Sequence, residues 1–311
     1  MKTLKHYIDI PFRWLIRIIL SNERLSKYLS RHFLKQYLAM FYCNWVGFFP
    51  NFKRPRDLNE SLLKLSLKNR KSDKRDTIVK CVDKYAVRQY VEEKGYGYTL
   101  NELIGVYEHV EDIDVDALPE RFVMKMNNAS GRNYICTDKS TVDWQKIIRH
   151  FSDWLKDTDF GLLSGEWQYS LIKPRIIIER FLENIGESSL IDYKFNCFNG
   201  EVLSCFVAYN RNPKDPHGEV CYDDYDLEWN RTERIKDDWH KKRKLIPRPK
   251  CLGEMIKMAS DISKGFEYVR VDLYEIEERI MFGELTFTPQ GCVLEFYKDI
   301  FLKEANKKMS L

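Results

Sequence analysis

The fold of this chain is decided by two neighbouring stretches, YVRVDLY at residues 268–274 and IMFGELTFTP at residues 280–289. Both are rich in β-branched and aromatic residues, and a polar turn separates them, so we expect two antiparallel strands. Each strand carries one carboxylate among apolar neighbours, Asp272 and Glu284. A buried carboxylate is unfavourable unless it is paired or bound to metal, so this pair indicates a magnesium site. The alternative is that both acids pair with basic neighbours such as Arg270.

Another hairpin is expected earlier in the chain, with strands at 122–126 and 134–136. Its tip, residues 127–133, consists of small polar residues whose backbone N–H groups could approach phosphate oxygens, and Lys125 adds a positive charge beside it. The tip lacks the spacing of a P-loop. An ordinary surface hairpin is the alternative interpretation.

Two more β segments complete the predicted sheets. Residues 174–182 form a buried strand that contains Glu179, and 192–200 with 201–209 form an alternating hairpin. Lys194 alternates with Phe195 along this hairpin, so its side chain should point away from the core, toward a cleft.

Helical periodicity covers the remaining segments between strands. A helix is expected from Asp76 to Glu93, ended by Gly95, and it carries Lys84. A lysine on an amphipathic helix is usually solvated, which is the alternative to a role in binding. Helices at 143–155 and 252–264 should pack on the sheets.

The chain of 311 residues has a formal net charge of only +4, which does not favour nucleic-acid binding. Its first 35 residues are different, because they contain eight Lys or Arg and two acids. The apolar run at 10–20 is interrupted by two arginines and is shorter than the ~20 residues that a spanning helix needs. This pattern predicts either a basic amphipathic helix on an anionic membrane surface, through residues 1–50, or a helix packed on the main body.

The eight cysteines contain no Cys-x-x-Cys pair, which argues against structural zinc. Most lie in apolar runs, and no cleavable signal peptide is evident, so we expect reduced thiols in a cytoplasmic protein. A long polar loop is expected from Asn210 to Pro249. Its basic run at 240–250 could clamp an anionic acceptor or could simply be solvated.

Five of these segments occur in the order found in ATP-grasp proteins. They are VDKYAVR at 82–88, FVMK at 122–125, IERFL at 178–182, DYKF at 192–195 with FNG at 198–200, and the two stretches at 269–289. Over about residues 59–289 the chain resembles the TupA-like ATP-grasp family, associated with bacterial teichuronopeptide, capsule or lipopolysaccharide synthesis.

The resemblance implies a site that binds ATP and Mg²⁺. Lys84, Lys125, Ser130, Gly131 and Asp192 would contact the nucleotide and its phosphates. Glu179, Phe181 and Leu182 would form the hinge, with the backbone near Phe181 at the adenine edge. Lys194 and Arg270 would act on the reacting phosphoryl group, and Asp272, Glu284 and Thr286 would hold magnesium.

Three positions depart from the family pattern. Thr286 stands where many ATP-grasp enzymes have asparagine. The hairpin tip has Asn128-Ala129-Ser130-Gly131 instead of a His-Gly-Ser-Gly-like sequence. Gln290 follows Thr288-Pro289, where the family usually has the glycine of Thr-Pro-Gly. The hairpin tip and this loop have therefore each lost a glycine, which could alter phosphate closure or substrate choice.

The family chemistry implied is carboxylate–amine ligation through an acyl-phosphate, with an anionic saccharide or uronic acid as acceptor and an amine donor. The expected location is the cytoplasm or the inner face of the membrane. The alternatives are a glycosyltransferase, for which Asp112-Ile113-Asp114 is a formal match, an ATP-dependent sugar phosphotransferase, and a non-catalytic membrane scaffold.

The predicted fold is α+β: two lobes, each an antiparallel sheet with helices, gripping a nucleotide after a helical basic N-terminal segment. The expected boundaries are 1–58 for this segment, 59–118 for a pre-grasp lobe, 119–185 for the N-subdomain and 186–311 for the C-subdomain.

Overall fold

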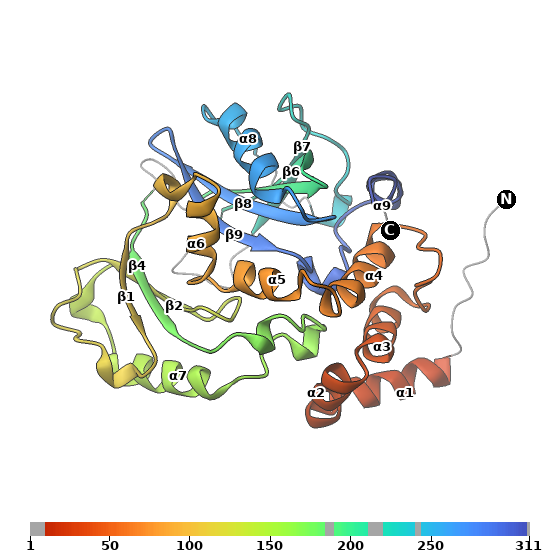
Figure 1. The fold of residues 1–311 in the computed structure, drawn as a ribbon, viewed down its shortest axis with the longest axis horizontal. Helices are drawn as coiled ribbons and strands as arrows, with labels where there is room; N and C mark the ends of the chain where they lie inside the picture. The colour runs from red at the N-terminus through yellow and green to blue at the C-terminus, as the bar shows by residue number, and fades with distance from the viewer. Residues whose placement is uncertain (1–9, 184–189, 211–219, 240–243, 310–311) are drawn as a thin grey trace.

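A computed structural model describes residues 10–183, 190–210, 220–239 and 244–309. Its described part contains two antiparallel sheets, seen in the left and the centre of Figure 1. The predicted α+β class and the helical N-terminal segment are both confirmed. The domain boundaries remain predictions.

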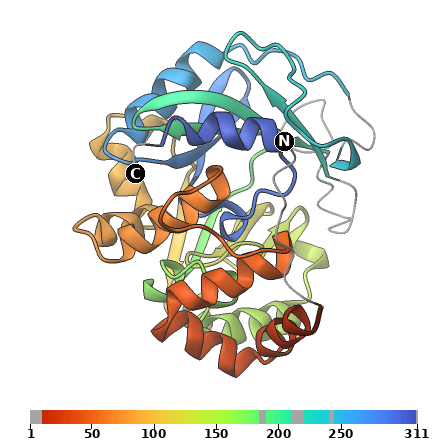
Figure 2. The ribbon, with the colours of Figure 1, turned by 90° about the vertical axis from the view of Figure 1, so that its right-hand side faces the viewer.

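Three short helices form the N-terminal segment and lie together at one end of the molecule (Figure 2). They are α1 (Ile10–Ser21), α2 (Glu23–His32) and α3 (Leu34–Val46). Asn22 caps α2 through its side chain, and Gly47, with φ 92°, ends α3 in the left-handed conformation that glycine adopts without strain. None of the described helices is long and apolar enough to cross a membrane.

The small sheet has the strand order β1-β4-β2-β3. Its strands are β1 (Leu103–Tyr107), β2 (Phe122–Met126), β3 (Asn133–Cys136) and β4 (Ile176–Arg180). One face packs on α7 (Trp144–Lys156) through Phe122, Met124 and Ile178. Because side chains alternate along a strand, Lys125 and Glu179 lie on the opposite face.

The large sheet has the order β7-β6-β5-β8-β9. Its strands are β5 (Asp192–Phe198), β6 (Glu201–Tyr209), β7 (Cys221–Tyr225), β8 (Val269–Ile276) and β9 (Arg279–Thr286). Helix α8 (Leu252–Ser263) covers one face, as Figure 1 shows. The hairpin of β8 and β9 confirms the strands predicted from the opening stretches.

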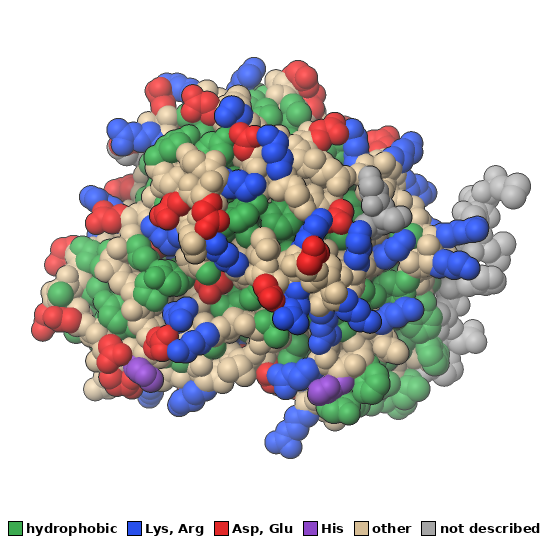
Figure 3. Space-filling model, in the orientation of Figure 1, with side chains coloured by type: hydrophobic (Ala, Val, Ile, Leu, Met, Phe, Trp, Pro, Cys, Tyr) green, Lys and Arg blue, Asp and Glu red, His purple; other side chains and the backbone are tan. Residues whose placement is uncertain are grey.

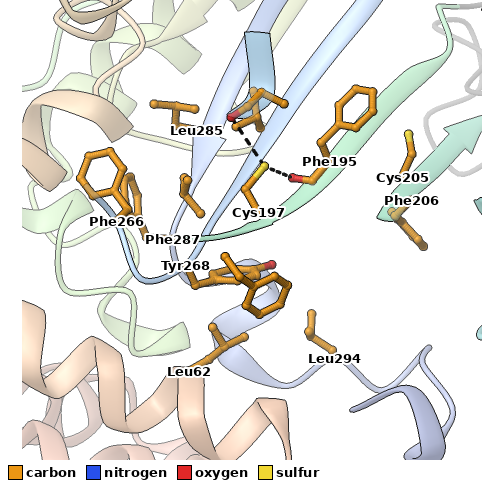
Figure 4. Packing of buried hydrophobic residues seen from close by; sticks show 14 of the residues in the cluster. Leu62, Phe195, Cys197, Cys205, Phe206, Phe266, Tyr268, Leu285, Phe287 and Leu294 are labelled. Carbon is orange, nitrogen blue, oxygen red and sulfur yellow. Dashed lines mark hydrogen bonds between the residues drawn. The ribbon is translucent and has the colours of Figure 1, made fainter. Parts of the chain in front are cut away.

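The main core joins this sheet to α4 (Leu58–Arg70), to α3 of the N-terminal segment and to the C-terminal α9 (Asp299–Asn306). Figure 4 shows Leu62 of α4 and Leu294 near Tyr268, on one side of the large sheet. Cys197 points to the other side, where its thiol donates to the Ala259 carbonyl of α8. All eight cysteines are free, and seven are buried. The seven buried thiols lie where small apolar side chains would, as expected, and their reduced state remains a prediction.

Two predictions about secondary structure are wrong. The segment 210–249 contains a strand, β7, because Asp223 and Asp224 are buried and have partners: Tyr209 donates to Asp223 at 3.0 Å, and Arg234 pairs with Asp224 at 3.0 Å. The helix expected from Asp76 to Glu93 is two helices, α5 (Arg75–Val82) and α6 (Val87–Glu93). Part of the basic run, 240–243, lies outside the described residues.

Candidate active site

A cavity of about 520 Å³ is lined by residues of both sheets. Most of the predicted site residues meet there, although they come from segments up to 202 positions apart. The lining includes twelve of them: Lys84, Lys125, Ser130, Gly131, Glu179, Leu182, Asp192, Lys194, Arg270, Asp272, Glu284 and Thr286.

Strand register explains how the large sheet contributes. Lys194 of β5 lies opposite Asp272 of β8, which in turn lies opposite Glu284 of β9. The next row on the same face contains Arg270 opposite Thr286. Because residues i and i+2 share one face, these two rows place an acid pair and two cations side by side at the cavity wall.

Asp272 is the centre of this wall. Arg270 donates to its two carboxylate oxygens, Nε to Oδ1 and Nη2 to Oδ2, each at 2.7 Å, and Lys194 pairs with Oδ2. Burial acts to raise the pKa of Asp272, but the charges of Arg270 and Lys194 outweigh it and lower this pKa to about 2. The carboxylate is therefore ionised and held in a fixed orientation.

Glu284 is more open than Asp272, with 36% of its side chain exposed. Arg270 Nη2 lies 3.4 Å from its Oε1 and donates to the Thr286 hydroxyl at 3.0 Å, while that hydroxyl donates to Glu284 at 3.3 Å. Pairing of both acids with Arg270, the alternative to a metal site, is thus present in the structure.

This donor set still fits magnesium. No group of three or more His, Cys, Asp or Glu that could hold a metal occurs among the described residues. Magnesium in nucleotide sites takes one or two carboxylates and completes its octahedron with phosphate and water oxygens. Glu284 and Asp272 supply two carboxylates at one point of the cavity wall, and the Thr286 hydroxyl adds a further oxygen atom there.

The small sheet contributes a looser charged pair. Lys125 Nζ lies 2.7 Å from Glu179 Oε2, and Arg88 lies 3.6 Å from Oε1. Asn101 also lines the cavity and donates to the carbonyl of Arg180 at 2.8 Å. Sequence reasoning missed Arg88 and Asn101, although Arg88 belongs to the VDKYAVR stretch.

Lys84 reaches the cavity because its helix is interrupted. The Asp83 carboxylate accepts the backbone N–H of Tyr85 at 2.8 Å and the side-chain amide of Asn127 at 3.0 Å, which ends α5. Lys84 N–H donates to Asn127 O at 3.0 Å, and Nζ donates to Ala129 O at 2.7 Å. Burial lowers the pKa of Lys84. The side chain is therefore fixed beside the hairpin tip and is not simply solvated.

The hairpin tip combines an exposed turn with an unsatisfied amide. Ser130 and Gly131 line the cavity, and Gly131 has φ 72°. Neither side-chain atom of the fully buried Asn128 has a hydrogen-bond partner in the structure. Buried amides usually have partners. Asn128 does not itself line the cavity, so the residues of the tip that can meet a ligand there are Ser130 and Gly131.

Glu166 is a cavity residue that no sequence motif indicates. Its carboxyl accepts the Ser164 hydroxyl at 2.6 Å and the Thr288 hydroxyl at 3.1 Å, and burial raises its pKa to about 7. Tyr169 lines the cavity nearby. A carboxyl that titrates near neutral pH inside a polar cavity is a functional candidate.

Phe181 is the predicted site residue that does not line the cavity. Its ring packs under the Arg121 guanidinium, 4.3 Å from the centroid, while Leu182 next to it does line the cavity. The proposed contact of the Phe181 backbone with adenine remains a prediction.

Several solved structures are similar to this chain. D-alanine–D-alanine ligase from Bacillus anthracis, complexed with ATP, is 16% identical, with a TM-score of 0.42 over 73% of this chain and 61% of that one. D-cycloserine synthetase is 16% identical, at 0.41 over 74% and 70%. L-amino acid ligase from Bacillus licheniformis is 13% identical, at 0.40 over 88% and 53%. This chain thus spans about 61% of the first structure's length.

No curated protein matches this chain. The family model described as TupA-like ATPgrasp matches residues 63–305, which is most of the sequence and includes every predicted site residue. The chain therefore belongs to the TupA-like ATP-grasp family.

Proposed function

We propose that this protein is an ATP- and Mg²⁺-dependent carboxylate–amine ligase. The γ-phosphoryl group of ATP would pass to a carboxylate oxygen and release ADP. An amine would then attack the acyl carbon, form the amide, lose a proton and release phosphate. The observation that carries the proposal is the Lys194–Asp272–Glu284 row facing Lys84 and Lys125 across one cavity.

The residues present suit this chemistry because it depends on positioning and charge neutralisation. Lys84, Lys125 and the hairpin tip would hold the phosphates, and Arg270 and Lys194 would stabilise the negative charge of the transferring group. Magnesium on Asp272, Glu284 and Thr286, when bound, would neutralise phosphate oxygens. Glu166 is suited to take the proton that the attacking amine loses, since it lines the cavity and burial raises its pKa to about 7.

The substrates we propose are an anionic saccharide, such as a uronic acid, and an amine, used in cell-surface polysaccharide synthesis. The family's association with such polymers supports this choice. The requirement for ATP and the eight free cysteines support a cytoplasmic site, which the N-terminal segment would bring to the inner face of the membrane. The glycosyltransferase alternative has little support, because Asp112 and Asp114 are exposed and do not line the cavity.

Calorimetry of ATP binding tests the proposal directly. Wild type should bind ATP more tightly with Mg²⁺ than without it. In Glu284→Gln, the increase in ATP affinity that Mg²⁺ causes should be at least about tenfold smaller, as expected for the loss of one charged ligand. Glu278→Gln is the matched control, since this acid is at the exposed tip of the same hairpin and pairs with Lys250. Failure of the wild type to bind ATP with or without Mg²⁺ would overturn the proposal.

Hydroxylamine trapping separates the ligase from the sugar phosphotransferase. Uronic acids incubated with the protein, Mg-ATP and hydroxylamine should give a hydroxamate together with ADP, because hydroxylamine captures an acyl-phosphate. ADP release with a phosphorylated sugar hydroxyl and no hydroxamate would establish the phosphotransferase instead.

A further inference from the structure

Helix α1 exposes an apolar stripe that no described segment covers. Trp14 is 65% exposed, Leu15 47% and Ile18 43%. Ile18 comes three residues after Leu15 and four after Trp14, so it is a neighbour of both on the helix surface. The three side chains together are here called the α1 face. Ile16, which is 2% exposed, anchors the other side of the helix in the protein. Three large apolar side chains exposed together on a short helix mark an interaction surface.

The surroundings of the α1 face are strongly basic. Residues 10–46 contain six Lys or Arg and a single acid, Glu23, which pairs with Lys27 at 2.7 Å. The basic residues are Arg13, Arg17, Arg24, Lys27, Arg31 and Lys35. Figure 3 shows hydrophobic and basic side chains gathered at the lower right, over the N-terminal helices. Exposed Trp and Leu beside arginine is the composition of helices that lie in an anionic membrane interface.

Other occupants fit this surface less well. A second copy would bring two like-charged surfaces together, which costs free energy. The described part of α1 has 12 residues, fewer than the about 20 that a spanning helix needs. An anionic lipid surface instead satisfies both properties of the segment, its apolar stripe and its positive charge.

The N-terminal helices are also connected to the cavity wall. Tyr37 of α3 donates to Leu163 O at 2.7 Å, and Arg31 pairs with Asp159. The segment that follows, at 164–166, carries Ser164 and Glu166, which are hydrogen-bonded to each other at the cavity. A surface that binds lipid through α1 would therefore hold the cavity at a fixed height above the headgroups.

We propose that α1 lies in the headgroup region of an anionic bilayer, with Trp14, Leu15 and Ile18 inserted and Arg13 and Arg17 at the lipid phosphates. This inference goes beyond the proposed ligase activity and does not depend on it. It defines the protein as a peripheral membrane protein.

Vesicle flotation of the full chain tests the apolar part. Wild type should float with phosphatidylcholine vesicles that contain phosphatidylglycerol. Trp14→Glu/Ile18→Glu should lower the partition coefficient on the order of 100-fold, because two apolar side chains leave the interface. Leu245→Glu/Ile300→Glu is the matched control, since these residues are 71% and 72% exposed elsewhere. Equal losses in both variants, or no flotation of wild type, would overturn the proposal.

Charge reversal tests the choice of an anionic partner. Arg13→Glu/Arg17→Glu should lower binding to phosphatidylglycerol-containing vesicles by on the order of 100-fold and abolish its salt dependence. Wild-type binding to pure phosphatidylcholine that equals its binding to anionic vesicles would contradict the assignment. A concentration-dependent dimer that forms in wild type but not in Trp14→Glu/Ile18→Glu would also contradict it, because it would show that a second copy covers the α1 face. Thermal unfolding of the same variants checks that they are folded, and Mg-ATP calorimetry separates this outcome from failure of the ligase proposal.

Discussion

On the large sheet, the side chain of Asp272 is 1% exposed and receives three contacts from two cations. On the small sheet, Glu179 pairs with Lys125, and a quarter of the Lys125 side chain is exposed to water. Both walls present an acid and a lysine to the same cavity. The difference lies in how completely the charges are removed from water.

This difference has an energetic meaning. Charges that are fully buried depend on each other, because removal of one leaves the others uncompensated. Charges that remain partly hydrated exchange partners at small cost. The large sheet therefore suits groups that must stay fixed during a reaction, and the small sheet suits groups that release one partner when phosphate enters.

Neutralising the central acid of each wall should give the largest contrast. Asp272→Asn is expected to lower the free energy of unfolding by about 3–5 kcal/mol, since Arg270 and Lys194 remain buried without a carboxylate. Glu179→Gln should cost only about 1 kcal/mol, because Lys125 and Arg88 can gain water. Urea unfolding of the two variants measures both values. Equal losses would remove the distinction between the walls.

Removal of the small-sheet lysine should affect binding and leave stability almost unchanged. Lys125→Ala is expected to weaken Mg-ATP binding by about 10- to 100-fold, the loss of one charged hydrogen bond, because Lys125 can turn from Glu179 to phosphate. Calorimetry measures the affinity, and thermal unfolding serves as the control. Unchanged affinity would place the phosphates away from this wall.

Glu166 should make stability depend on pH. Its pKa is raised by burial from 4.5 to about 7, so the folded state binds the proton more tightly than the unfolded state. The resulting stabilisation is complete below pH 4.5 and disappears as the pH rises through 7, a loss of about 2 kcal/mol between pH 5 and 7. Glu166→Gln should remove this part of the pH dependence in thermal unfolding. Parallel profiles for variant and wild type would show that Glu166 keeps its ordinary pKa.

The smallest effect is expected at Thr286. Thr286→Val keeps the shape and removes the hydroxyl between Arg270 and Glu284, so it should cost about 1 kcal/mol in stability. A change in the Mg²⁺ dependence of ATP binding of no more than about tenfold should accompany it. If ATP binding no longer depended on Mg²⁺ in this variant, the hydroxyl would be a principal metal ligand and Asp272 would be a less important one.

Much of the large-sheet wall could be predicted because its information is local. Alternation along β5 places Lys194 on the cavity face, and the short hairpin of β8 and β9 brings Asp272 opposite Glu284. Once the strands pair, their register and alternation determine which side chains share a face, with little dependence on the rest of the fold.

The missed features depend on tertiary contacts. The break at Asp83 requires Asn127, and β7 accommodates Asp224 because Arg234 neutralises it. Glu166 has no periodic pattern around it, and only burial against Thr288 gives it an altered pKa. The partners of Asp83 and Glu166 are 44 and 122 positions away, and Arg234 meets Asp224 only after the chain has turned back, so propensity and periodicity could not reveal these relations.

The interruption at Asp83 also has a mechanical consequence. Asn127 is bonded at once to the Asp83 carboxylate, to Lys84 N–H and to Arg175 N–H, which ties the end of α5 to the small sheet. Lys84 therefore travels with the hairpin as one rigid unit. Whatever angle the two sheets adopt, the distance between this ammonium group and the hairpin tip stays constant, and opening or closing of the cavity changes only their joint distance to Glu284.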